Sequence, residues 1–102
     1  MTEWVSVAST LDLEDGDVAS YEVGDAYVAI ACVAGSYYAF DDACTHRGCS
    51  LSEGELDGTT LVCPCHAGEF DVRTGEVLDG PPPDPVVTYP VRLSGDDVEI
   101  QV

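Results

Sequence analysis

The amino-acid sequence predicts an all-β fold, an antiparallel β-sandwich or barrel formed by a single domain over residues 1–102. Short runs rich in β-branched and aromatic residues recur along the chain, and turn signals containing glycine or aspartate separate them. We find no heptad pattern, internal repeat or low-complexity tract. A chain of 102 residues is long enough for one small domain with a modest core.

The predicted strands follow one another in chain order. An alternating segment opens the fold with Trp4 as a core anchor, and the acidic stretch 12–17 forms a helical turn or a loop. Gly24-Asp25 is a hairpin signal, and Ser94–Asp97 is the turn of a closing hairpin. The expected strands are 4–7, 18–23, 26–33, 37–40, 59–62, 69–72, 86–93 and 98–102.

Two short clusters in the middle of the chain each contain a cysteine and a histidine. Cys44 and His46 form the first pair, and Cys63 and His66 form the second. Two cysteines and two histidines can bind either zinc or an iron–sulfur cluster. In zinc fingers cysteine pairs with cysteine and histidine with histidine, whereas here each cluster mixes the two. That mixing suits a two-iron cluster with both cysteines on one iron and both histidines on the other.

This pattern resembles the two boxes of Rieske [2Fe–2S] proteins, and the resemblance extends over about residues 41–83. It implies a Rieske-like fold, in which a small cluster-binding subdomain, about 42–83, is inserted into the antiparallel β base. It also implies one Rieske-type [2Fe–2S] cluster per chain, held by Cys44, His46, Cys63 and His66.

The resemblance has two further implications. Cys49 and Cys65 match the positions where quinol-oxidising Rieske proteins have a disulfide, although two buried free thiols are the alternative. Rieske proteins cover the cluster with a proline-rich third loop, although a plain connector is the alternative here. The matching residues are Gly80, Pro81, Pro82 and Pro83. The fifth cysteine, Cys32, lies in a strand-like run and is interpreted as a small buried hydrophobe.

The second box differs from that of high-potential Rieske proteins. Those proteins have serine and tyrosine hydroxyls that donate hydrogen bonds to the cluster sulfurs, and the matching residues here are Gly68 and Phe70. Neither side chain can donate. Because hydrogen bonds to the sulfurs raise the reduction potential, we expect a potential near the lower end of the Rieske range.

The chain is strongly acidic, with twenty aspartates and glutamates against three basic residues and a net charge of −17. This sign excludes a typical nucleic-acid binder. Three interpretations fit the charge: steering toward basic redox partners, adaptation to a saline cytoplasm, or solubility alone. Arg47, which follows the ligand His46, is either a contact for a partner protein or a solvated surface charge.

No apolar run approaches the length of a transmembrane helix, and the N-terminus lacks the basic and apolar regions of a secretory signal. From these features we expect a soluble, cytoplasmic protein, monomeric and without a membrane partner.

The function implied by the resemblance is that of a ferredoxin, an electron carrier rather than an enzyme. It would take single electrons from a ferredoxin reductase to a terminal enzyme, most often a Rieske non-haem iron oxygenase acting on aromatic or related substrates. A Rieske small subunit of another oxidoreductase, such as nitrite reductase or a quinol-oxidising chain, is the alternative. Two alternatives of other classes are a zinc-stabilised interaction module and a disulfide-exchange enzyme.

Overall fold

The computed structural model describes residues 3–43, 49–64, 68–80 and 85–101. These residues form short β-strands and one turn of 3-10 helix. The elements are β1 (Trp4–Ser9), β2 (Val18–Val23), β3 (Ala26–Val33), β4 (Ser36–Asp41), η1 (Leu51–Glu53), β5 (Glu55–Asp57), β6 (Thr60–Val62), β7 (Glu69–Asp71), β8 (Val77–Asp79), β9 (Thr88–Tyr89), β10 (Val91–Ser94) and β11 (Asp97–Gln101). The predicted all-β class is confirmed. Within the described residues, no helix is long and apolar enough to cross a membrane.

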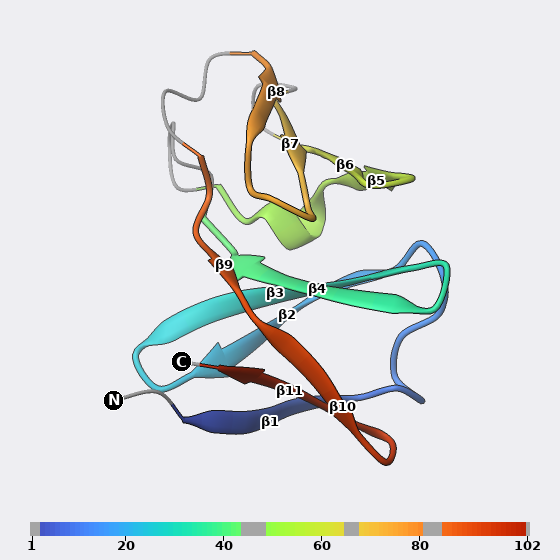
Figure 1. Ribbon diagram of the computed structural model, residues 1–102. Helices are drawn as coiled ribbons and strands as arrows, with labels where there is room; N and C mark the ends of the chain where they lie inside the picture. Colours follow the sequence, from blue (N-terminus) through green and yellow to red (C-terminus); the bar gives the residue numbers. More distant parts are fainter. Residues whose placement is uncertain (1–2, 44–48, 65–67, 81–84, 102) are drawn as a thin grey trace.

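The strands form three antiparallel sheets, with the orders β1-β11-β10, β2-β3-β4-β9 and β5-β6-β7-β8. The first two sheets pack together as the base of the molecule, and the third lies above one end of that base (Figure 1). All four strands of the third sheet fall between β4 and β9 in the chain. An insertion between two base strands is therefore present, as the resemblance to Rieske proteins implies.

Strand β3 connects the two cores of the protein because it is buried on both faces. Val28, Ile30 and Cys32 pack with Val98 and Ile100 of β11 in the core between the base sheets. Ala29 and Ala31 point the other way, toward a second core shared with the small sheet. A strand alternates its side chains between two faces, so this one segment supplies both cores. Cys32 is 4% exposed, which confirms its interpretation as a buried hydrophobe.

The structure differs from the sequence prediction at three strands. The predicted strand 86–93 is two strands, because Pro90 has no N–H to donate and separates β9, which pairs with β4, from β10, which pairs with β11. Strands β5 and β8 were not predicted. Each has three residues, too few for an alternating pattern, and acidic residues occur in both.

Candidate metal centre

The small sheet presents the second predicted ligand loop. Cys63 directly follows β6, is 1% exposed, and carries a free thiol. Its backbone N–H donates to the carbonyl of Gly68 at 2.7 Å, which extends the pairing of Val62 with Glu69 by one step. The hydrogen bond closes the base of a loop at residues 64–67. Cys63 is thus held by main-chain pairing in the position where that loop begins.

The base of the first predicted ligand loop is closed in the same manner. Ala43 and Ser50 form an isolated antiparallel bridge, and the amide of Leu51 donates to the carbonyl of Asp42 at 3.0 Å. Beyond this bridge the chain continues into η1, whose Leu51 is fully buried. The two ends of the loop are therefore fixed between β4 and η1.

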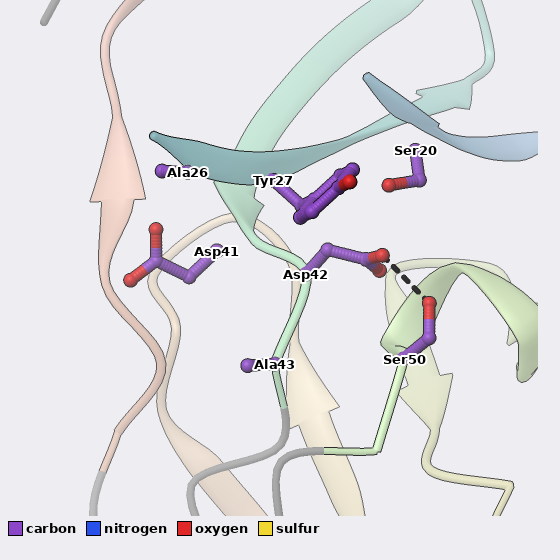
Figure 2. Close-up of a pocket in the computed structure, with 7 residues that line it drawn as sticks. All are labelled: Ser20, Ala26, Tyr27, Asp41, Asp42, Ala43 and Ser50. Atoms are coloured by element: carbon purple, nitrogen blue, oxygen red, sulfur yellow. Dashed lines mark hydrogen bonds between the residues drawn. The ribbon is translucent and has the colours of Figure 1, made fainter. Parts of the chain in front are cut away.

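Asp42 adds side-chain hydrogen bonds to this closure. Its carboxylate is 7% exposed and accepts from the Ser50 hydroxyl at 2.6 Å and from the Ser52 amide at 2.7 Å. Figure 2 shows Asp42 directed at Ser50, while Asp41 points to the opposite side of the strand. These residues lie beside an open hollow of about 530 Å³, and Tyr27 from β3 forms another part of its lining.

The bases of the two loops meet in one core. Cys63, Leu61 and Phe70 of the small sheet belong to the same buried cluster as Leu51 of η1, and the partly buried Cys49 packs against it. The end of the first loop and the start of the second are therefore neighbours in space. Cys49 and Cys63 are separated in the sequence by η1, β5 and β6. Because β5 and β6 pair as an antiparallel hairpin, η1 lies beside the core that contains Cys63.

Gly54 permits this close approach. A Cβ atom at Gly54 would lie 2.0 Å from the carbonyl oxygen of Val62, the residue before Cys63. Backbone atoms cannot move aside as the end of a flexible side chain can, so any other residue would push η1 away from β6. Gly54 is therefore a packing requirement beside a predicted ligand.

The third predicted loop begins at the same end of the small sheet. Val62, Glu69 and Asp79 pair side by side across β6, β7 and β8, so Gly80 leaves β8 next to the base of the second loop. The chain returns at Val86, whose amide donates to the carbonyl of Gly75 at 2.9 Å. The two described ends of this segment thus attach to the small sheet.

The return segment is also bound to the base. The Tyr89 hydroxyl donates to the Asp41 carboxylate at 2.5 Å, and the Asp41 amide donates to the carbonyl of Val87 at 2.9 Å. Partial burial, with a further contribution from the bond to Asp41, raises the pKa of Tyr89 to about 12. Tyr89 therefore keeps its proton throughout the physiological range.

A second carboxylate stabilises the turn after β7. Asp71 is 8% exposed. Its carboxylate accepts three hydrogen bonds from Arg73: from the backbone amide at 2.9 Å, from Nε at 3.1 Å and from a terminal guanidinium nitrogen at 2.9 Å. The hydrogen bonds and charge of Arg73 hold the pKa of Asp71 below its usual value, although burial opposes them. Arg92 pairs with Glu99 at 2.6 Å, so both described arginines are bound to carboxylates. The described surface consequently offers many unpaired acids and no unpaired base.

The predicted site residues divide by whether the structure describes them. Cys63, Cys49 and Gly80 are described, whereas the other predicted residues lie outside the described residues. These are Cys44, His46, Arg47, Cys65, His66, Pro81, Pro82 and Pro83. Cys49 is disulfide-bonded, and its predicted partner Cys65 lies in the segment that is not described, so that pairing stays a prediction. No group of three possible metal ligands occurs among the described residues, which include one of the four predicted ligands.

The described part fits a cluster with thiolate ligands. Cys63 offers a buried thiol that is not used in a disulfide, at the mouth of a loop that holds a histidine three residues later. Gly68 and Phe70 provide no hydroxyl, and Phe70 is 1% exposed within the core that contains Cys63. The Asp42 network is the part of the site that the sequence analysis missed. A Ser-Leu-Ser segment following the first box was its only signal.

Comparison with known proteins gives a consistent result. The profile of the Rieske [2Fe-2S] domain family matches residues 3–90. The ferredoxin component of the naphthalene 1,2-dioxygenase system of Pseudomonas aeruginosa is 38% identical over 103 residues, which cover 100% of this chain and 99% of that protein.

Two solved structures extend the similarity to the fold. The ferredoxin of Sphingomonas yanoikuyae B1 superposes with a TM-score of 0.93 at 30% identity, covering 98% of this chain and 99% of that one. A chain from the complex of reduced oxygenase and oxidized ferredoxin in carbazole 1,9a-dioxygenase superposes with a TM-score of 0.89 at 36% identity. The match covers 95% of this chain and 91% of that chain.

Proposed function

The chain belongs to the Rieske [2Fe–2S] domain family, and from this membership we propose that it is the ferredoxin of an aromatic-ring dioxygenase system. It carries a Rieske-type [2Fe–2S] cluster and passes single electrons from a reductase to a terminal oxygenase. The observation that supports this best is the near-complete coverage of both chains in the match to a dioxygenase ferredoxin. The chain is therefore an electron carrier and not itself the oxygenase.

We further propose that Cys44 and Cys63 are the thiolate ligands of the cluster and that His46 and His66 are its imidazole ligands. The position of Cys63 supports this assignment, because its free thiol is buried where the second loop begins. When bound, the cluster supplies a one-electron couple. Two thiolates leave the oxidised cluster with a less negative charge than four would, so an electron is added more easily.

The chain's own residues complete the site in three ways. The core around Leu61 and Phe70 excludes water from Cys63. We propose that a Cys49–Cys65 disulfide joins the two ligand loops, and that Gly80 to Pro83 cover the cluster. Exclusion of water and control of hydrogen bonds are the means by which a protein sets the potential of such a centre.

Measuring iron and acid-labile sulfide, with absorption spectra, tests the assignment. We expect two irons and two sulfides per chain, and His66→Ala should lose the Rieske spectrum while Arg73→Ala keeps it. A colourless protein that binds one zinc per chain would contradict the proposal and support the zinc-stabilised module instead.

Reconstitution tests the role of the carrier. A dioxygenase reductase and terminal oxygenase of the naphthalene or carbazole type should turn over substrate only when this ferredoxin is added. Failure with every such oxygenase, together with rapid reduction by a quinol, would favour the quinol-linked alternative.

The remaining expectations accompany this proposal. We propose a single-domain, monomeric carrier that works in the cytoplasm, with Arg47 as a contact for a redox partner. The acidic surface supports docking against a basic partner, and reduction rates that fall steeply with added salt would test that docking.

A further inference from the structure

Asp42 stands out because it is a buried carboxylate with no ion-pair partner among the described residues. The described ion pairs of the chain use Asp71 and Glu99. Removing a carboxylate from water is costly unless hydrogen bonds replace its hydration. The donors that satisfy Asp42 therefore show what the residue holds in place.

Among the described residues, the side-chain bonds of Asp42 go to one short segment. Its Oδ1 accepts from the Ser52 amide at 2.7 Å, and its Oδ2 accepts from the Ser50 hydroxyl at 2.6 Å. The Ser52 hydroxyl lies 3.2 Å from Oδ2 and 2.9 Å from the Ser50 hydroxyl. Two hydroxyls and one amide thus converge on a single carboxylate.

The main chain of Asp42 adds a bond in each direction. Its amide donates to the carbonyl of Tyr27 in β3 at 3.0 Å, and its carbonyl accepts from Leu51 at 3.0 Å. Asp42 is therefore anchored to the base of the molecule on one side and to η1 on the other. Residues 44–48, which include two predicted ligands, lie between the two points that it joins.

We propose that Asp42 is a positioning residue for the first ligand loop, fixing the separation of its two ends so that Cys44 and His46 are presented to the cluster. This inference depends on the ligand assignment under Proposed function. The main chain joins the loop ends by the bridge between Ala43 and Ser50 and by the bond from the Leu51 amide, and the carboxylate of Asp42 adds bonds to Ser50 and Ser52 that fix the end of the loop further. The described bonds of Asp42 go to the two ends of the loop, so it acts on the predicted ligands through those ends.

Neighbouring residues provide a matched set of variants. Asp42→Ala removes all the side-chain bonds, and Ser50→Ala combined with Ser52→Ala removes the hydroxyl donors without changing the charge. Asp42→Asn keeps an acceptor for the Ser52 amide and serves as the conservative variant. Asp41→Asn is the control, because it removes a carboxylate one residue away whose described side-chain bond goes to Tyr89.

The experiment compares cluster-loaded proteins by two measurements, the rate of iron loss to a chelator and the EPR line shape after reduction. We expect Asp42→Ala to lose iron about tenfold faster, the lower end of the effect of removing groups that orient metal ligands. Its EPR line shape should change or broaden, and the double serine variant should change in the same direction. Asp42→Asn should fall between Asp42→Ala and the unmodified protein, and Asp41→Asn should match the unmodified protein.

Two results would overturn the inference. One is an Asp42→Ala or double serine variant with the iron-loss rate and line shape of the unmodified protein. The other is an Asp41→Asn variant that changes as much as Asp42→Ala, because loss of charge would then explain the effect. If Asp42→Ala fails to fold, the double serine variant alone decides the question. Failure of the ligand assignment is distinguishable, since the unmodified protein would then lack a Rieske signal.

Discussion

The base and the small sheet of this protein are stabilised in different ways. The base pairs β3 with both neighbours over six residues each, and its cores use both faces of that strand. The small sheet consists of four strands of three residues, which pair over two or three positions. Such short strands rarely form a stable sheet alone.

The small sheet compensates with polar contacts near the loops. Asp42 holds the start of η1, and Asp71 holds the turn after β7. The difference indicates a division of roles. The base has an apolar core of its own between its two sheets, whereas the apolar core of the small sheet is shared with β3 and η1. We therefore expect the small sheet to depend more on polar contacts and on the proposed cluster.

Removal of the cluster should have the largest effect. It should destabilise the small sheet while the base stays folded. We expect amide hydrogen exchange in residues 49–64 and 68–80 to accelerate by about a hundredfold or more, because metal binding supplies folding free energy to its site. Strands β2, β3 and β4 should stay protected. Mass-spectrometric exchange on loaded and cluster-free protein measures this, and uniform loss of protection along the chain would refute the division.

Truncation in the base core should affect stability without affecting the cluster. Ile30 is fully buried between the base sheets, so Ile30→Ala should lower the free energy of unfolding by about 3 kcal/mol. Urea unfolding provides the measurement, and Leu93→Ala is the control because Leu93 is 51% exposed. The reduction potential of Ile30→Ala should equal that of the unmodified protein, and a shifted potential would show that the regions are coupled.

Addition of a hydroxyl beside the second loop should raise the reduction potential. Phe70→Tyr restores the donor of high-potential Rieske proteins, and one hydrogen bond of about 1 kcal/mol corresponds to roughly 40 mV in a one-electron couple. Protein-film voltammetry measures the change. The control is Phe40→Tyr, which adds a hydroxyl to the base side of the same core. Equal shifts in both variants would indicate a general effect of polarity.

The smallest expected effect concerns the loss of folding stability at acidic pH. The pKa of Asp71 is lowered in the folded state, so its contribution is present above its unfolded pKa and is lost as pH falls through the folded value. Arg73→Ala removes the side-chain bonds and the charge that lower this pKa, while the backbone amide of residue 73 still donates. Thermal unfolding should therefore show a smaller loss of stability between neutral and strongly acidic pH in Arg73→Ala than in the unmodified protein. Parallel pH profiles would contradict this role for Arg73.

The sequence predicts the base better than the small sheet for a physical reason. A long strand with alternating or continuous apolar residues, such as β3, is easy to recognise because the pattern extends over many residues. Gly24 marks the turn between β2 and β3. Strands β5 and β8 lack that pattern. They are strands because β5 pairs with β6 and β8 pairs with β7, and not because their own composition favours a strand. The break at Pro90 was readable from its missing N–H.

The candidate site was predictable only in part. The spacing of Cys44, His46, Cys63 and His66 indicated a Rieske centre, because the predicted ligands lie in two short clusters that can be recognised directly in the sequence. The network of Asp42 was not predictable, because its bonds to Ser50 and Ser52 depend on how the loop ends meet in space. The roles of the residues outside the described segments stay predictions.

Pulsed EPR on reduced protein labelled with ¹⁵N-histidine tests the central claim most directly. The chain contains two histidines, so uniform histidine labelling marks His46 and His66 and no other residue. We expect couplings from the nitrogens of two histidines to the reduced [2Fe–2S] cluster. A paramagnetic cluster with no histidine coupling, or a protein without any such signal, would contradict the assignment of this chain's ligands.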